Sequence, residues 1–342
     1  MVVGKKFVFA KHFVGEPKDG DLVLETFEVP PVKDGEILVE AEYLSVDPYM
    51  RPYTARMPTG ITMIGSQVAK IVESKNPNYP VGKKIVGNLG WITHSVLNPD
   101  DTPKNTLVSQ KPYLLPDLEP LSSSLALGML GMPGNTAYFG FLEICKPKAG
   151  ETVVISGAAG AVGSHVGQIA KILGLKVIGI AGTAAKCNWL VDELGFDQAI
   201  NYKTDDIAAC LKKAAPNGVD CYFDNVGGEI SSLVINHMND YGRVSVCGCI
   251  SSYNNNLDYA VNEIPKATII QPAVVFHQLK IEGFIVMKWA DRWLEGIQKN
   301  LAWIREGNIK YKETVTEGFD NMFKAFTGML KGENTGKAIV KV

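Results

Sequence analysis

An apolar run that ends in a glycine-rich turn is the feature that most constrains the fold of this chain. Residues 152–155 read as a short buried strand, and residues 156–163 follow with the sequence Ser-Gly-Ala-Ala-Gly-Ala-Val-Gly. Residues 164–173 then space their apolar side chains as a helix does. Small residues let a phosphate approach the backbone, and the helix N-terminus supplies unpaired N–H groups. The pattern indicates a pyrophosphate-binding turn, with a purely structural tight turn as the alternative.

Strands and helices alternate around this turn, from residue 151 to about residue 286. We expect strands at 152–156, 176–181, 198–201, 219–224, 243–247 and 280–286, and helices at 164–173, 185–194, 205–214 and 230–238. Apolar strands joined by crossover helices form a parallel sheet that is covered on both faces. Six such strands predict an α/β fold with the doubly wound dinucleotide-binding (Rossmann) sheet.

The remainder of the chain has a different pattern. Residues 36–43 and 67–73 are strand-like and bounded by Pro, Gly and Asn-Pro turns, which predicts an irregular antiparallel β-barrel. The tail should form a helix at 293–305, a strand at 310–315, a helix at 319–330 and a closing strand at 337–342. We expect the tail to return to the first domain. The predicted domains are therefore 1–125 completed by 307–342, and 126–306.

Composition narrows the classes of function. A length of 342 residues with 46% hydrophobic side chains suits about two domains with packed cores. The formal net charge of −2 gives no reason to expect nucleic acid or an anionic membrane as a partner. The N-terminal residues lack the apolar core of a signal peptide, and all six cysteines lie in the second half. We therefore expect a cytoplasmic protein with reduced thiols and no membrane segment.

The residues after the second predicted strand favour NADPH over NADH. A site for NADH usually places Asp or Glu about 20 residues beyond the glycines. Residues 180–186 here read Ile-Ala-Gly-Thr-Ala-Ala-Lys, without an acid. Gly182 leaves room for a 2′-phosphate, Thr183 can donate a hydrogen bond, and Lys186 brings a cation. The alternative for Lys186 is a solvated helix lysine.

A catalytic metal is not expected. Alcohol dehydrogenases with this two-domain plan hold zinc through Cys and His side chains of the first domain. In this chain no cysteine precedes Cys145, and the early histidines are His12 and His94. The Cys-Gly-Cys sequence at 247–249 can be read as half of a metal or redox site. We favour packed thiols, because Cys247 ends a predicted strand.

A metal-free NADPH site can still deliver hydride to the β-carbon of an α,β-unsaturated carbonyl. Negative charge then gathers on the carbonyl oxygen as an enolate, which needs a hydrogen-bond donor. A neutral tyrosine is suited to this role. Tyr253 is the first candidate because it follows the fifth strand, and loops at the carboxyl ends of parallel strands line the ligand crevice. Tyr49 is the second, and a surface tyrosine is the alternative for Tyr253.

Several longer motifs occur in one order along essentially the whole chain. They include Lys-His-Phe-Val-Gly at 11–15, Val-Asp-Pro-Tyr-Met-Arg at 46–51, Gly-Met-Pro-Gly at 131–134, Asn-Tyr-Lys at 201–203 and Asp-Cys-Tyr-Phe-Asp-Asn-Val-Gly-Gly at 220–228. Together they resemble the prostaglandin reductases (leukotriene hydroxydehydrogenases), which are zinc-independent medium-chain dehydrogenases/reductases. The resemblance implies a GroES-like barrel beside the Rossmann sheet. It also implies NADPH-dependent 15-oxoprostaglandin 13-reductase or 2-alkenal reductase activity in lipid metabolism, by a cytosolic homodimer.

The resemblance further implies a set of cofactor contacts. At the pyrophosphate these are Ala159, Gly160, Ala161, Val162 and Gly163; near the adenosine phosphate they are Lys186 and Tyr202. The others are Asn225, Cys247, Gly248, Ile250, Ser251, Tyr253, Phe284, Ile285, Val286 and Asn334. Arg56 matches a family arginine that would bind the carboxylate of a fatty acid, with a solvated loop charge as the alternative.

One segment departs from the family. Between residues 253 and 280 the mammalian members carry a proline-rich stretch, and a tyrosine where this chain has Phe276. We expect this loop to border the substrate, which leaves open whether the substrate is an eicosanoid or another enone or enal.

The sequence leaves two alternative functions open and also bears on the oligomeric state. A quinone oxidoreductase is the nearest alternative enzyme, and a nicotinamide-binding protein without catalysis is the alternative of another class. The last strand, 281–286, would be an exposed sheet edge in a monomer, which favours a homodimer.

Overall fold

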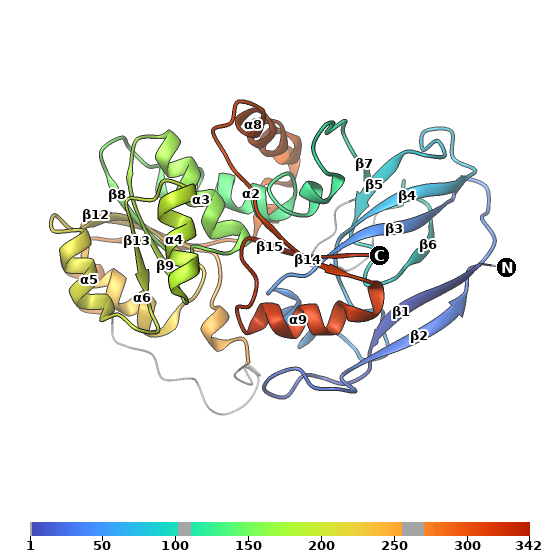
Figure 1. The fold of residues 1–342 in the computed structure, drawn as a ribbon, viewed down its shortest axis with the longest axis horizontal. Helices are drawn as coiled ribbons and strands as arrows, with labels where there is room; N and C mark the ends of the chain where they lie inside the picture. The colour runs from blue at the N-terminus through green and yellow to red at the C-terminus, as the bar shows by residue number, and fades with distance from the viewer. Residues whose placement is uncertain (1, 102–110, 255–269) are drawn as a thin grey trace. The chain divides into compact units, whose positions relative to one another are not determined.

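The computed structural model describes residues 2–101, 111–254 and 270–342 (Figure 1). The chain divides into two compact units: unit 1 comprises Met1–Gly128 and Glu313–Val342, and unit 2 comprises Met129–Lys312. The corresponding expectation from the sequence is 1–125 with 307–342 for the first domain and 126–306 for the second. Most of the divergent loop, residues 255–269, lies outside the described residues.

Unit 2 contains the six-stranded sheet that the sequence predicts. The strand order is β10-β9-β8-β11-β12-β13, and neighbouring strands run parallel. The strands are β8 (Thr152–Ser156), β9 (Lys176–Ala181), β10 (Gln198–Asn201), β11 (Val219–Asp224), β12 (Met238–Val246) and β13 (Lys280–Gly283). The order and direction confirm the doubly wound α/β fold.

The first four strands have the predicted bounds, and the last two differ. β12 begins at Met238 rather than at residue 243, because its pairing with β11 shifts register around a turn where Tyr241 has a φ of 62°. β13 ends at Gly283 rather than at residue 286. The chain leaves the sheet there because the ring of Phe284 packs over Gly140, where a Cβ atom would lie 2.3 Å from it.

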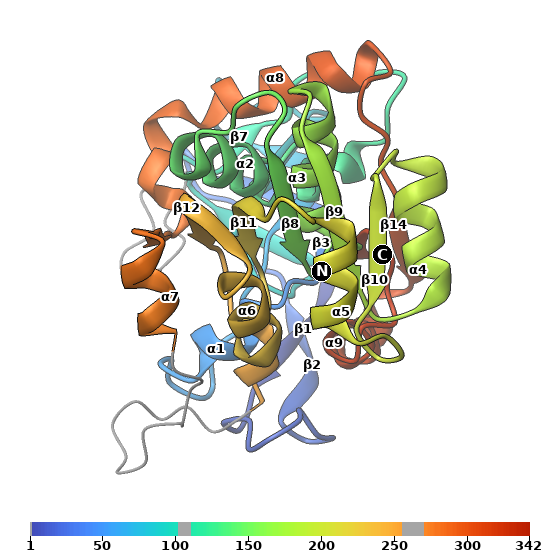
Figure 2. The same ribbon diagram turned by 90° about the vertical axis from the view of Figure 1, so that its left-hand side faces the viewer.

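Helices cover both faces of this sheet (Figures 1 and 2). The α-helices of unit 2 are α2 (Met132–Phe139), α3 (Ala161–Ile172), α4 (Ala184–Asn188), α5 (Ile207–Ala214), α6 (Gly228–Ile235), α7 (Gln271–Phe276) and α8 (Trp293–Arg305), the last of which packs on α2. Shorter helical turns are η2 (Gly140–Cys145), η3 (Trp189–Glu193), η4 (Ile250–Ser252) and η5 (Val286–Arg292). On one face, α5 and α6 bury Leu211 and Val234 against Tyr222 of β11. The helix expected at 185–194 is α4 followed by the π-helical turn η3.

Unit 1 is built mainly from antiparallel strands. They are β1 (Val3–Phe9), β2 (Leu22–Glu28), β3 (Ile37–Ser45), β4 (Gln67–Ser74), β5 (Lys84–Gly87), β6 (His94–Leu97), β7 (Tyr113–Leu114), β14 (Glu313–Glu317) and β15 (Lys337–Lys341). Its helices are α1 (Met50–Thr54), α9 (Met322–Leu330), η1 (Ser123–Leu127) and η6 (Phe319–Asn321). One sheet has the order β14-β15-β3-β4-β5-β7 with β6 on β3, and β1 pairs with β2.

The C-terminal tail joins unit 1, as the sequence predicts. β15 pairs antiparallel with β3, while β14 pairs parallel with β15 and is the exception to the antiparallel pattern. The core of unit 1 contains Phe9, Met50, Trp91 and Phe326, so the tail helix α9 and the N-terminal strands share one apolar cluster. Burial of these large side chains is the main source of stability of the unit.

Candidate functional site

The glycine-rich turn connects β8 to α3 at the carboxyl end of the strand. Gly157 has a φ of 58°, which favours glycine. A Cβ atom on Gly163 would lie 2.5 Å from the carbonyl oxygen of Gly157, so glycine there lets the helix approach the turn. Gly160 is the N-cap of α3 and has no side chain. No side chain therefore caps the first turn of α3, which is compatible with an anion site at a helix N-terminus.

Hydrogen bonds join this turn to the loops that follow the next two strands. Asn225, after β11, donates from its backbone N–H to Ser156 Oγ at 2.9 Å and from Nδ2 to the Ser156 carbonyl at 2.7 Å. Ile250 and Ser251, after β12, donate from their backbone N–H groups to the carbonyls of Asn225 and Val226. Because β8, β11 and β12 are neighbours, three of the predicted groups of cofactor contacts meet at one edge of the sheet.

Tyr253 lies in the loop that follows β12. Its hydroxyl oxygen accepts a hydrogen bond from the backbone N–H of Cys249 at 3.4 Å. A Cβ atom on Gly248 would lie 2.9 Å from the same oxygen, so glycine at 248 leaves room for the hydroxyl. Burial and, to a lesser extent, the carboxylate of Asp224 raise the pKa of the Cys247 thiol to about 12. Cys247 is therefore a neutral packing group at neutral pH.

The end of β9 gathers the residues expected near the adenosine phosphate. A Cβ atom on Gly182 would lie 2.9 Å from the Tyr202 hydroxyl, so the tyrosine ring occupies the space that this glycine leaves. Thr183 Oγ1 accepts a hydrogen bond from the Lys186 N–H and caps α4. Burial and the neighbouring charge of Lys203 lower the pKa of Lys186. Sequence reasoning missed Lys203, although it stands beside Tyr202 in the Asn-Tyr-Lys motif.

Two of the three side chains in the segment 284–286, which the family resemblance places at the cofactor, are packed inside the protein. The ring of Phe284 lies 5.5 Å from that of Trp289 and 6.3 Å from that of Phe223, inside an aromatic cluster. Val286 is buried, whereas Ile285 is 52% exposed. A cofactor contact at these positions therefore depends on the backbone and on Ile285.

Three of the predicted site residues belong to unit 1. Tyr49 occupies the N-cap position of α1 without a side-chain cap, and its ring lies 5.1 Å from that of Tyr53. Burial, followed by the charge of Asp47, raises the pKa of Tyr49 well above its usual range. The Tyr49 phenol therefore stays protonated and can donate a hydrogen bond. Arg56 is exposed just after α1, and Asn334 donates from Nδ2 to the Gly336 carbonyl in the turn before β15.

Sequence reasoning also missed Arg51, which is 4% exposed. Its guanidinium donates to the carbonyl of Gly15 at 2.9 Å and lies 5.2 Å from the centre of the Phe13 ring. Arg51 thus holds the loop that carries the Lys-His-Phe-Val-Gly motif against α1. Both motifs, at 11–15 and 46–51, can be recognised in the sequence, but no residue near either of them indicates that the two segments are in contact.

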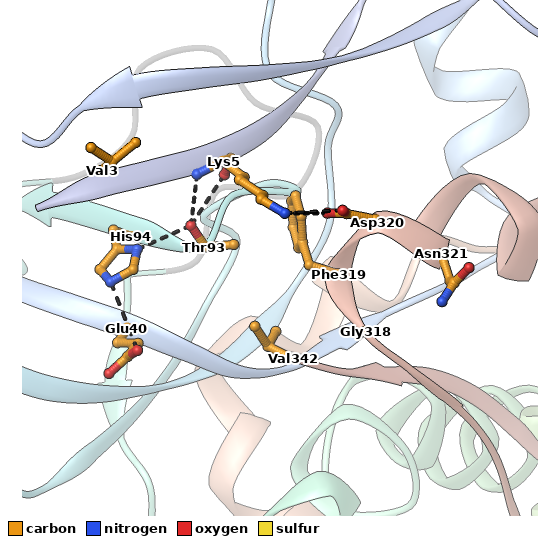
Figure 3. A pocket seen from close by; sticks show the side chains of 10 residues that line it. All are labelled: Val3, Lys5, Glu40, Thr93, His94, Gly318, Phe319, Asp320, Asn321 and Val342. Carbon is orange, nitrogen blue, oxygen red and sulfur yellow. Dashed lines mark hydrogen bonds and ion pairs between the residues drawn. The ribbon is translucent and has the colours of Figure 1, made fainter.

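A separate pocket of about 510 Å³ lies in unit 1 (Figure 3). Four of its side chains lie in pairs: Lys5 binds Asp320 at 2.9 Å, and His94 lies 3.8 Å from Glu40. Thr93 links the two pairs, through the backbone of Lys5 and the ring of His94. The predicted site residues do not line this pocket.

In the part of the chain that the structure describes, no three His, Cys, Asp or Glu side chains gather where they could hold a metal ion. Over the same residues, no helix is both long and apolar enough to cross a bilayer.

Two regions of the chain match known protein families. Residues 5–104 match the family described as the N-terminal domain of oxidoreductase, and residues 161–302 match the family described as zinc-binding dehydrogenase. With the six-stranded parallel sheet and the separate, mainly antiparallel unit, these matches define an oxidoreductase of the medium-chain dehydrogenase/reductase class.

Individual relatives narrow this class. Prostaglandin reductase 1 of Bos taurus is 49% identical to the chain over 100% of both sequences. The NADP(+)-dependent 2-alkenal reductase of Nicotiana tabacum is 37% identical over 99% of this chain and 98% of the relative. The crystal structure of CurA from Vibrio vulnificus in complex with NADPH matches with a TM-score of 0.89, 35% identity and 99% coverage of both chains. The chain belongs to the prostaglandin reductase family, which confirms the resemblance drawn from its motifs.

Proposed function

We propose that this protein uses NADPH to reduce the C=C bond of α,β-unsaturated carbonyls, with 15-oxoprostaglandins and related enones and enals as the substrate class. The observation that carries the proposal is the meeting of the glycine turn, Asn225 and the Tyr253 loop at neighbouring strand ends. A full-length relative that is a prostaglandin reductase supports the same chemistry.

The cofactor residues fit NADPH in both charge and shape. The uncapped N-terminus of α3 suits the pyrophosphate. Lys186 and Lys203 lie close enough for their charges to interact, and that repulsion is relieved when a dianionic phosphate binds between or beside them. Tyr202 and Thr183 stand at the same strand end. We therefore assign the 2′-phosphate to this group.

NADPH held by these residues would supply a hydride for the β-carbon of the substrate. The protein must then hold the enolate oxygen with a hydrogen-bond donor. Tyr253 is our first candidate, because its loop adjoins Asn225 and the glycine turn. Tyr49 is the second, because its phenol stays protonated. Solvent or a relayed proton completes the α-carbon. We assign Arg56 to a substrate carboxylate.

We also propose that unit 1 supplies substrate contacts, that unit 2 binds the cofactor, and that the protein is a cytosolic homodimer. β13 is an edge strand of the parallel sheet. Within β13, Ile281 is 38% exposed, and in the preceding helix α7, Val275 and Phe276 are 69% and 78% exposed. Pairing of two such edges would cover both the unpaired backbone and these side chains. A monomeric mass by light scattering would overturn the dimer.

The experiment that tests the function is NADPH consumption with four additions: a 15-oxoprostaglandin, a medium-chain enal, a simple quinone and no acceptor. We expect turnover of the prostaglandin or the enal. Turnover of the enal alone keeps the chemistry and moves the role to detoxification. Turnover of the quinone alone would replace the proposal by a quinone oxidoreductase. Binding of NADPH without turnover of any acceptor would leave a nicotinamide-binding protein.

A further inference from the structure

One carboxylate oxygen lies at the centre of the cofactor loops. Asp224, the last residue of β11, is 3% exposed. Its Oδ1 accepts hydrogen bonds from Ser156 Oγ at 2.9 Å, Tyr222 Oη at 2.8 Å, Val226 N at 3.0 Å and Gly227 N at 2.9 Å. Four donors therefore converge on one oxygen. Among the residues that the structure describes, Asp224 forms no ion pair within 4.0 Å, so its charge is stabilised by these hydrogen bonds.

Three of these donors belong to segments beside the proposed cofactor site, and the fourth, Tyr222, is a core residue of β11 itself. Ser156 ends β8 immediately before the glycine turn, and its Oγ also accepts the N–H of Asn225. Val226 and Gly227 form the turn into α6. The backbone of Asp224 adds a third connection, because its carbonyl accepts the N–H groups of Cys247 and Gly248. One residue is thus bonded to the end of β8, to its own loop and to the loop that leads to Tyr253.

We propose that Asp224 is a positioning residue that fixes the loops after β8, β11 and β12 in the arrangement that binds NADPH; this inference rests on the proposed function. It acts through its neighbours, because its Oδ1 is already surrounded by protein donors. A buried carboxylate beside a pyrophosphate site would repel the ligand if its charge were exposed. The four donors stabilise that charge, and hydrogen bonds to a charged acceptor are about twice as strong as neutral ones.

The same strand offers a matched control. Asp220 lies at the opposite end of β11, where Oδ2 accepts the N–H of Thr152 at 2.8 Å and Oδ1 accepts Asn239 Nδ2 at 2.8 Å. It therefore ties β11 to the same two neighbouring strands, β8 and β12. Because cofactors bind at the carboxyl ends of parallel strands, Asp220 is on the wrong edge to position the cofactor loops. Asp220→Asn makes the same change from carboxylate to amide in a side chain that also bonds β11 to β8 and β12.

The experiment compares Asp224→Asn and Asp220→Asn in the full chain. NADPH binding is titrated by the fluorescence of the bound nicotinamide, and backbone order is measured by amide hydrogen exchange. We expect Asp224→Asn to raise the Kd for NADPH about tenfold, since a neutral acceptor holds the four donors more weakly. It should speed exchange at residues 225–228 and 247–253. Asp220→Asn should leave the Kd within about twofold of the wild-type value.

Two results would overturn the inference. One is an Asp224→Asn protein whose Kd and loop exchange match those of the wild type. The other is an Asp220→Asn protein that loses as much affinity as Asp224→Asn. If the wild type itself does not bind NADPH, the proposed function fails, and the exchange comparison alone decides whether Asp224 orders these loops. If Asp224→Asn does not fold, Ser156→Ala removes one donor of the same group and should shift Kd and exchange in the same direction.

Discussion

Lys337 Nζ lies 2.8 Å from Asp47 Oδ1, and both side chains are almost fully buried, at 5% and 6% exposure. The ammonium also donates to the carbonyls of Val46 and Ala338 at 2.8 and 2.9 Å. The other carboxylate oxygen of Asp47 accepts the hydroxyl of Ser45. The last strand of the chain is therefore bonded to the segment that carries Tyr49.

Removing one partner of the Lys337–Asp47 ion pair should destabilise the folded protein. Lys337→Met leaves the Asp47 carboxylate buried without its cation, and we expect a loss of about 3–5 kcal/mol in the free energy of unfolding. Lys341→Met, on the same strand, is the control: its ion pair with Glu317 is long, at 4.0 Å, and its side chain is 50% exposed. That change should stay within about 0.5 kcal/mol. Equal denaturation midpoints for the two variants would refute a structural role for the pair.

His165 should make the stability of the protein depend on pH. The buried ring lies on α3, with Nε2 3.0 Å from Asn300 Oδ1, and burial lowers its pKa from 6.5 to about 4. Because the folded pKa is depressed, the unfolded chain takes up the proton first. The contribution of the neutral His165 ring to the free energy of unfolding is fully present above about pH 6.5 and is lost as the pH falls toward 4. We expect the loss to reach about 2 kcal/mol between about pH 7.5 and about pH 5.

The matched variant for this prediction is His165→Gln, whose amide can donate to Asn300 but does not titrate. Urea unfolding of both proteins at the two pH values isolates the contribution of the histidine from that of other groups. An identical pH dependence in the two proteins would show that His165 has an ordinary pKa.

Removing the hydroxyl group of Tyr253 or of Tyr49 shows which of the two donates the hydrogen bond to the enolate oxygen. Tyr253→Phe removes the donor that we place at the enolate oxygen and should lower kcat about a hundredfold on an enone, with a smaller change in the KM for NADPH. Tyr49→Phe is the paired test. If Tyr253→Phe keeps full kcat and Tyr49→Phe loses it, the donor is Tyr49. Full activity in both would place the donor on another group.

Lys186 should discriminate between the two nicotinamide cofactors. Lys186→Glu places a carboxylate where we expect the 2′-phosphate and should raise the KM for NADPH about tenfold or more, with little effect on the KM for NADH. Lys212→Glu, an exposed position on α5, makes the same change of charge away from the site. An equal effect of Lys186→Glu on both cofactors would remove Lys186 from this role.

Local patterns in the sequence predict much of the fold. The four strands at 152–156, 176–181, 198–201 and 219–224 have their predicted bounds, since each is a short apolar run between turn residues. The helix at 293–305 is also correct. The end of β13 is wrong because it depends on a distant residue: Gly140 leaves the space into which Phe284 turns. Such a contact has no signature near residue 284.

Some features of the candidate site can likewise be predicted from neighbouring residues, whereas others depend on long-range contacts. The glycine turn and the absence of an acid after β9 can be read from neighbouring residues. The bonds of Asp224 to Ser156, 68 positions away, and of Lys337 to Asp47, 290 positions away, cannot, because they form only when the strands are paired. Arg51 is a similar case, since its carbonyl partner at Gly15 is 36 positions away.

The most direct measurement is the position of the transferred hydrogen. NADPH with both hydrogens at C4 of the nicotinamide replaced by deuterium is incubated with the protein and an enone, and the product is examined by mass spectrometry and NMR. We predict a saturated ketone with one deuterium at the β-carbon and an intact carbonyl. An allylic alcohol with deuterium on the former carbonyl carbon would contradict C=C reduction, and so would a product without deuterium.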